Sequence, residues 1–317
     1  MPMNPYLRNK KFAVLGERIE TDTGTEGMIW MKTEQGNVGH SRQKTTSELK
    51  MRVQTGAMMT IVGILVLWLS SYPYVLNAVA ALLSISGIYE LLRAVKQYSR
   101  PRMLMLSLVA IVICIWGFPH YPLILTIVWT ASMVVFFILM RCLGKVHFSS
   151  FASILPCTVM LPLFFRSFVE IRQWPYGLSI LILVTLGCIV NDVAAYFVGR
   201  AIGSHKLAPI ISPGKTVEGG LGGFILSTAL LEIISSVFTI CTGNQIRYGI
   251  LLIYLMLASL IGQFGDLSMS MIKRSVGIKD FGNILPGHGG ILDRFDSLLF
   301  VAPFAVIYYR ITGGFLR

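Results

Sequence analysis

The chain has 317 residues, of which 54% are hydrophobic and only 13% are charged, and its mean hydropathy is +0.69. Charged residues make up about a quarter of an ordinary soluble domain, so this composition excludes that class and predicts a membrane protein. The formal net charge is +12. We attribute it to lysines and arginines in cytoplasmic loops, as membrane topology requires, and not to nucleic-acid binding.

The N-terminal segment, residues 1–49, is polar, mixed in charge and without apolar periodicity. We interpret it as a cytosolic tail of unassigned role, with some local structure around Met28–Met31. Its opening residues, MPMNPYLRNKKF, contain no apolar run typical of a cleavable signal peptide, so none is expected.

Hydrophobic runs of about 20 residues, each able to cross a bilayer, recur from Gly56 onwards. We therefore expect residues 50–317 to form one all-α, polytopic transmembrane domain with about nine helices and cytoplasmic catalytic loops. The predicted spans are residues 56–70, 74–92, 103–118, 122–140, 149–165, 177–198, 219–241, 248–268 and 298–315.

The loops between these spans alternate in positive charge. The tail to Arg52 holds nine lysines or arginines, and the loops after the second, fourth, sixth and eighth spans hold four, two, three and four. The other loops hold none, none, two and one. Because positive loops stay in the cytoplasm, we expect the loops 200–218 and 269–297 to face it and the C-terminus to lie outside.

Five of the six aspartates fall in the second half of the chain, and Asp192 and Asp266 lie inside predicted spans. An ionisable group in a transmembrane helix is costly and indicates function, although a structural ion pair is the alternative for any one of them. Asp293 and Asp296 stand three residues apart, so their carboxylates would repel one another without a cation. A hard cation such as Mg²⁺, carrying a phosphorylated substrate, fits such a group.

Two loops add candidate anion-binding residues. In ISPGKTVEGGLGGF, residues 211–224, Lys215 and Thr216 follow Pro213-Gly214 in what looks like a phosphate-binding turn before a helix. A Walker A loop is excluded, because Pro209 stands where its first glycine would be. Close helix packing is the alternative for Gly222 and Gly223. Elsewhere, the spacing of Glu90 and Arg93 predicts an ion pair.

The second loop, residues 270–297, combines four basic residues, five glycines and three aspartates. Gly287, Gly289 and Gly290 would let the backbone approach a ligand closely. His288 stands between them as a phosphate donor or proton carrier, with an ordinary hydrogen-bonded loop histidine as the alternative. His205 has no comparable neighbours in the sequence, and we assign it no role.

The same loop carries a resemblance to a known family. Its pattern, from Ser270-x-Ile272-Lys273-Arg274 through Leu285-Pro286-x-His288-Gly289-Gly290 to Asp293-Arg294-Phe295-Asp296, resembles the signature of phosphatidate cytidylyltransferases, also called CDP-diacylglycerol synthases. The segments Ser212–Gly219 and Asp192–Arg200 are similar to the family's too. The likeness covers about residues 50–317 and leaves out the tail.

The resemblance implies a Mg²⁺-dependent reaction in which CTP and phosphatidic acid give CDP-diacylglycerol and pyrophosphate, with room for a second cation. It assigns CTP and phosphatidate binding to residues 190–297. The implied metal ligands are Asp266, Asp293, Asp296 and Asp192, and the implied catalytic residues are Asp266, Asp293, Lys273 and Lys215. The implied substrate-binding residues are Ser212, Thr216, Glu218, Arg274, Lys279, Asp280, His288, Gly289, Gly290, Arg294 and Tyr196. A homodimer is also implied by the resemblance, and the compact size of the chain favours a bacterial inner membrane.

Three other functions remain open at this point. A CTP-dependent kinase for a polyprenol-type lipid would share the metal and nucleotide machinery. An ion-coupled transporter would use the intramembrane carboxylates as ion sites, but such sites lie in corresponding positions of two halves, and the charges here crowd into one half. A non-catalytic lipid-binding scaffold would not need the pairing of Asp266 with Asp293.

Overall fold

The structure, a computed structural model, describes residues 30–72, 74–96, 98–116 and 160–315. The chain divides into two compact units, Met1–Leu49 and Lys50–Arg317. The predicted span 122–140 and most of the predicted span 149–165 lie outside the described residues. The second unit holds the apolar part of the chain.

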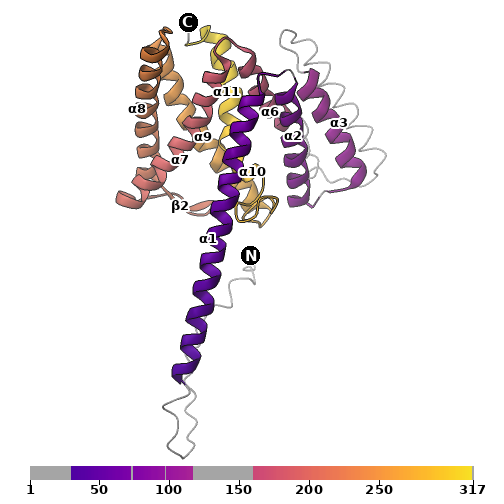
Figure 1. Cartoon of the computed structure of the whole chain (residues 1–317), viewed down its shortest axis with the longest axis vertical. Helices are drawn as coiled ribbons and strands as arrows, with labels where there is room; N and C mark the ends of the chain where they lie inside the picture. The colour runs from indigo at the N-terminus through magenta and orange to yellow at the C-terminus, as the bar shows by residue number, and fades with distance from the viewer. Residues whose placement is uncertain (1–29, 73, 97, 117–159, 316–317) are drawn as a thin grey trace, which may run out of the picture. The chain divides into compact units, whose positions relative to one another are not determined.

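The described part of this unit is mostly helical (Figure 1). Its helices, in chain order, are α1 (Trp30–Leu69, which begins in the first unit), α2 (Val75–Ala94), α3 (Arg100–Trp116), α6 (Leu161–Gln173), α7 (Gly177–Ile202), α8 (Val217–Thr242), α9 (Tyr248–Ser275), α10 (Leu292–Phe295) and α11 (Leu298–Thr312). Two short strands, β1 (Lys206–Ala208) and β2 (Ser212–Thr216), lie between α7 and α8.

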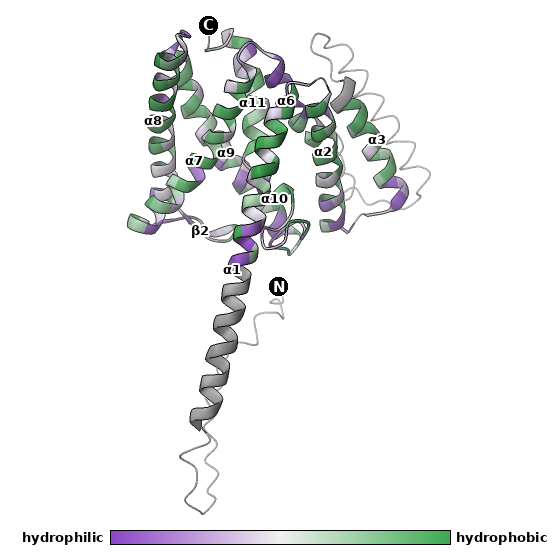
Figure 2. Ribbon diagram, in the orientation of Figure 1, coloured by the Kyte–Doolittle hydropathy of each residue, from purple (hydrophilic) through white to green (hydrophobic). Residues whose placement is uncertain are grey.

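Five of the described helices are long and apolar enough to cross a membrane: Lys50–Leu69, Val75–Ala94, Gly177–Ile202, Val217–Thr242 and Tyr248–Ser275. Hydrophobic residues run along them in Figure 2. The prediction of a helical, multi-pass membrane protein is confirmed in this form. The predicted count of nine includes spans outside the described residues.

The prediction for residues 166–175 was wrong. We expected a loop there, but α6 continues to Gln173. Its charged side chains are accommodated by partners on other helices, because Glu170 forms an ion pair with Arg310 at 2.7 Å and Arg172 Nε donates to Ser70 Oγ at 2.8 Å. The charged side chains of this segment therefore form contacts between helices and do not indicate a loop exposed to water.

The prediction of an all-α fold was wrong for the connection between α7 and α8. There β1 and β2 pair antiparallel, with Lys206 opposite Thr216 and Ala208 opposite Ser212. β1 has only three residues, and β2 reads Ser-Pro-Gly-Lys-Thr without a large apolar side chain, so neither shows the alternating apolar pattern by which a strand is recognised. The hairpin carries Lys215 to the end of α7.

Helices α7, α8 and α9 pack closely around small and polar residues. A side chain at Gly222 would come within 2.5 Å of Val198, and one at Gly223 within 2.9 Å of Ala195. These two glycines therefore serve helix packing, which was the alternative interpretation of them. Buried Asn191 also joins the three helices, and its Oδ1 accepts a hydrogen bond from Ser259 Oγ at 2.7 Å.

Candidate active site

The polar segments singled out in the sequence meet at one end of the helices, around β2 and α10 (Figures 1 and 2). Three of them are the β1–β2 hairpin, the C-terminal turns of α9 and the loop that precedes α10. The start of the apolar part of α1 also contacts that loop, because a Cβ at Gly56 would lie 3.6 Å from His288 Nε2.

Three aspartates from separate elements form an electrostatically coupled group, which we call the carboxylate cluster: Asp192 on α7, Asp266 on α9, and Asp296 between α10 and α11. The pKa of Asp296 is raised to about 7 by burial first and then by the negative charges of Asp266 and Asp192, which together outweigh the lowering by the Ser297 backbone hydrogen bond and by Lys273. Carboxylates that lie close together raise one another's pKa in this way, and a bound cation would favour their ionised form.

Asp266, one member of the carboxylate cluster, has two partners outside the cluster. Its Oδ2 forms an ion pair with Lys215 Nζ from the hairpin, and its Oδ1 accepts a long hydrogen bond of 3.4 Å from Ser270 Oγ. Asp266 and Ser270, four residues apart, therefore share one face of α9. Lys215 and Asp266 are partly exposed, at 30% and 21%, so their partners can be exchanged for a ligand.

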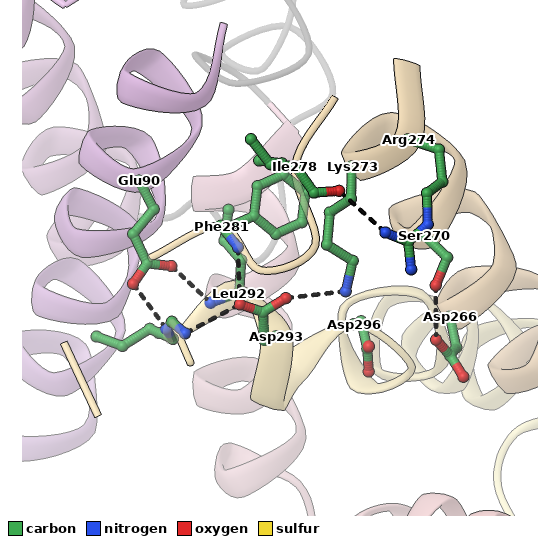
Figure 3. Close-up of polar contacts among 12 residues, drawn as sticks. Glu90, Asp266, Ser270, Lys273, Arg274, Ile278, Phe281, Leu292, Asp293 and Asp296 are labelled. Carbon is green, nitrogen blue, oxygen red and sulfur yellow. Dashed lines mark hydrogen bonds and ion pairs between the residues drawn. The ribbon is translucent and has the colours of Figure 1, made fainter. Parts of the chain in front are cut away.

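Asp293 lies in a different environment. Its Oδ1 accepts from Lys273 Nζ at 2.8 Å, and its Oδ2 accepts from the amides of Phe281 at 2.8 Å and Gly290 at 2.9 Å. The Asp293 side chain is only 2% exposed. Figure 3 shows Lys273 extending to Asp293, with Asp296 between this pair and Asp266. Both oxygens of Asp293 are thus engaged in holding the loop before α10.

Glu90 contacts the site through a role that the sequence reasoning missed. It is 1% exposed, and its two oxygens accept from the amides of Ile291 at 2.8 Å and Leu292 at 2.9 Å (Figure 3). The predicted ion pair with Arg93 was wrong, because Arg93 Nη1 donates instead to Tyr89 Oη. No sequence pattern could show this contact, since it joins residues 201 positions apart.

The loop glycines make room for these acids. A Cβ at Gly290 would come within 2.5 Å of the Glu90 carboxylate, and one at Gly289 within 3.0 Å of Asp293 Oδ2. Gly289 also has φ +83°, which an L side chain rarely adopts. We expected such glycines to let the backbone approach a ligand; the structure shows that they approach Glu90 and Asp293.

The hairpin is fixed to the start of α8 by two contacts. Thr216 is the N-cap residue, and its Oγ1 accepts from the amide of Gly219 at 3.1 Å. Glu218 receives the His205 ring at 2.6 Å and the His205 amide at 3.1 Å. His205, to which we assigned nothing, is therefore a partner of Glu218, and the pair positions the strand that bears Lys215.

The remaining predicted residues lie in four places. Arg274 donates to the carbonyls of Ile211 and Ile278, both at 3.2 Å. Tyr196 is 60% exposed on α7 and its hydroxyl accepts from Arg200 at 3.2 Å. Ser212 opens β2. An open pocket of about 510 Å³ brings together Lys279, Asp280, His288, Gly289 and Arg294.

The polar residues beneath the cluster were also missed. Gln263 Nε2 donates to Asn191 Oδ1 at 3.2 Å and to the carbonyl of Gly220 at 3.0 Å, which ties α9 to both α7 and α8. Asn191 immediately precedes Asp192, and Gln263 lies three residues before Asp266. That adjacency is the sequence feature by which they could have been found.

The carboxylate cluster suits a hard divalent cation by the chemistry of its oxygen donors. Among the described residues, no three His, Cys, Asp or Glu side chains already form a cation site. Mg²⁺ commonly binds through one or two carboxylates and completes its shell with water and substrate phosphates. The residues therefore fit an ion that arrives with a nucleotide. Asp293 would have to exchange its present partners to join, so its role as a ligand stays a prediction.

Comparison with known proteins agrees with the resemblance. The sequence pattern of the cytidylyltransferase family matches residues 50–312. A protein of Thermotoga maritima named phosphatidate cytidylyltransferase is 31% identical over 277 residues, which make up 85% of this chain and 99% of that relative.

Two further relatives with the same name match a shorter segment. The protein of Bacillus subtilis is 47% identical over 141 residues, and that of Staphylococcus saprophyticus is 49% identical over 127. These segments cover 44% and 40% of this chain, and the chain spans about half the length of these two relatives, 51% and 47%. Since the family pattern extends over most of the sequence, the chain belongs to the cytidylyltransferase family.

Proposed function

We propose that the chain transfers CMP from CTP to phosphatidic acid, giving CDP-diacylglycerol and pyrophosphate for phospholipid synthesis. The observation that carries the proposal is the carboxylate cluster beside two lysines from separate elements, Lys215 on β2 and Lys273 in the last turn of α9. The name and the nearly full-length match of the Thermotoga maritima relative give independent support.

The transfer forms one bond and breaks another. A phosphate oxygen of the lipid attacks the α-phosphorus of CTP, and the bond from that phosphorus to the bridging oxygen of the β-phosphate breaks. Pyrophosphate leaves with the electron pair. A phosphate monoester is already ionised near pH 7, so no strong general base is required. Positioning and neutralisation of charge carry such a reaction.

The chain's own residues supply that neutralisation. Lys215 stands on a hairpin fixed by Thr216 and by Glu218, and it is exposed enough to move from Asp266 to a phosphate. Lys273 is fixed by Asp293 close to Asp296. When bound at Asp192, Asp266 and Asp296, Mg²⁺ would supply charge neutralisation for the triphosphate. A second cation remains part of the proposal.

The proposed location is a bacterial inner membrane, with the site facing the cytoplasm, where CTP and Mg²⁺ are found. The excess of lysine and arginine in loops 200–215 and 273–294 supports this orientation. A homodimer remains part of the proposal.

The deciding experiment uses full-length protein purified in detergent, mixed micelles of phosphatidic acid, and CTP labelled at either the α- or the γ-phosphate. CMP transfer moves the α label into lipid and leaves the γ label in pyrophosphate. A lipid kinase acting on polyprenol would instead move the γ label into lipid. Absence of α-labelled lipid, with protein shown to be folded by a cooperative thermal transition, would refute the proposal.

A further inference from the structure

The open pocket of about 510 Å³ beside the loop before α10 is basic. Its lining includes Arg52, Lys279 and Arg294, and Asp280 is the one acidic residue among the residues that line it. These side chains come from three separate parts of the chain: the start of the apolar part of α1, the loop after α9, and α10 itself.

Arg52 is held against this loop by a close backbone contact. A Cβ at Gly287 would lie 2.9 Å from Arg52 Cγ, and Gly287 has φ +74°, so glycine is favoured there for both reasons. One turn further along α1, Gly56 faces the ring of His288. Arg52 is thus positioned over the loop, although only 6% of the apolar window of the segment Lys50–Leu69 is buried.

The pocket also lies where a lipid head group would reach it. Arg52 is the third residue of the candidate membrane span that begins at Lys50. The first residues of a span lie near the membrane interface, which is where the phosphates of bilayer lipids are found. A pocket beside Arg52 is therefore open to a head group that stays in its leaflet.

Charge separates this pocket from the carboxylate cluster. A phosphate monoester carries a charge of about −1.5 to −2 at pH 7, so the cluster would repel it, whereas three cationic side chains would attract it. The two regions meet at α10: Arg294 lines the pocket, and Asp296, two residues later, belongs to the cluster. A phosphate in the pocket would therefore adjoin a nucleotide held at the cluster.

We propose that this pocket binds the phosphate monoester head group of the lipid acceptor, with Arg52 as a specificity-determining residue. The inference rests on the proposed function and assigns its two substrates to different subsites. The planar guanidinium of Arg52 offers paired donors that match two phosphate oxygens, which an ammonium group cannot do.

The first test compares steady-state kinetics of wild type, Arg52→Gln and Arg52→Lys in mixed micelles. The matched control is Lys50→Gln, two residues earlier on the same helix, because Lys50 is exposed and outside the pocket lining. Loss of one charged hydrogen-bonding partner is expected to raise KM for phosphatidic acid about 10-fold or more in Arg52→Gln. KM for CTP should stay within twofold, Arg52→Lys should be intermediate, and Lys50→Gln should match wild type.

The second test measures binding without turnover. Dihexanoyl phosphatidic acid should raise the thermal unfolding temperature of the wild type and of Lys50→Gln but not of Arg52→Gln, while CTP with Mg²⁺ should raise it in all three. If phosphatidic acid stabilised the protein only when Arg52 is present, but no CDP-diacylglycerol were made, the subsite would stand and the proposed reaction would be refuted. A rise in KM for CTP instead, or unchanged constants for both substrates in Arg52→Gln, would overturn the subsite.

Discussion

The two lysines of the site differ in how deeply their ion pairs are buried. The Lys273 and Asp293 side chains are 11% and 2% exposed, whereas those of Lys215 and Asp266 are 30% and 21% exposed. Removing one partner of a buried pair leaves an uncompensated charge away from water, which costs about 3–5 kcal/mol. Ion pairs nearer the surface contribute far less to stability.

We therefore expect Lys273→Met and Lys215→Met to separate stability from catalysis. Lys273→Met should lower the free energy of unfolding by about 3 kcal/mol, since buried Asp293 loses its partner. Lys215→Met should leave the unfolding temperature nearly unchanged and lower CMP transfer by about 100-fold, as loss of one electrostatic contact to a transition state does. Thermal unfolding in detergent and the labelled-CTP assay measure the two effects, and equal destabilisation by both substitutions would contradict this division.

The same reasoning applies to Asp293→Asn, a substitution that would lower turnover alone if Asp293 served only as a metal ligand. The Asp293 carboxylate accepts hydrogen bonds from Lys273 and from two backbone amides. An asparagine retains one acceptor oxygen but turns an N–H group towards these donors. We now expect Asp293→Asn to lower the unfolding temperature as well as activity, and normal thermal stability in this variant would favour a role as metal ligand alone.

The raised pKa of Asp296 predicts that the stability of the protein depends on pH. This pKa is raised from an ordinary value near 3.8 to about 7 by burial first and then by the charge of Asp266. The folded state therefore retains this proton over a range where the unfolded chain releases it. The stabilisation is fully present below about pH 4 and is lost as the pH rises through about 7.

Without divalent ions, the unfolding temperature of the wild type should fall as the pH rises from 5 to 8. The unfolding temperature of Asp296→Asn should fall less steeply over the same range. Mg²⁺ should offset the fall in the wild type, because a cation favours the ionised carboxylates, and its effect should grow with pH. The measurement is thermal unfolding at half-unit pH steps with Mg²⁺ or with EDTA. A Mg²⁺ effect of equal size at pH 5 and pH 8 would argue against a cation at this cluster.

Among the elements, α10 and the loop before it depend on a residue from a distant helix. Glu90 on α2 accepts both backbone amides at the start of α10, and this short helix carries Asp293 and Arg294. Without that acceptor, the buried amide of Leu292 and the half-buried amide of Ile291 would lose their partner and the turn would shift. A displacement of about 1 Å in a catalytic group can cost on the order of 100-fold in rate.

Glu90→Ala should accordingly lower kcat by about 10- to 100-fold, and KM for CTP should change little. Glu90→Gln should recover part of the rate, because its amide oxygen still accepts from a backbone N–H. The matched control is Glu232→Gln on α8, where Oε2 is buried without a hydrogen bond to any described residue. If the Glu90 variants changed only thermal stability and kept the wild-type kcat, Glu90 would be structural and not a positioning residue.

The sequence predicted the features of these elements that depend on local chemistry. Hydrophobic length located the long helices, and the high cost of charge in a membrane identified Asp192 and Asp266. Contacts between distant residues were not predictable: Glu90 with Ile291, and Lys215 with Asp266. The hairpin was also missed, because its pairing lies in a segment too short for any periodicity.

For the whole molecule, the order of helices fixes which loops share a side. Helix α7 ends at the hairpin, α8 leads away from it to residues 243–247, and α9 returns to end at Ser275 (Figure 1). The hairpin and the end of α9 therefore lie on one side of a membrane crossed by these helices. The loops on that side carry more lysine and arginine than residues 242–247, which hold one.

Cysteine labelling can test this arrangement and its orientation together. In a variant without native cysteines, Ser204→Cys and Ser275→Cys should react with a membrane-impermeant maleimide only in inside-out membrane vesicles, because both exposed positions lie on the side of the carboxylate cluster. Gln245→Cys, exposed in the loop between α8 and α9, should react only in right-side-out vesicles. If Ser204→Cys and Ser275→Cys reacted from opposite sides, the three helices could not all span the membrane. If all three reactivities were reversed, the helical arrangement would stand, but CTP and Mg²⁺ of the cytoplasm could not reach the site.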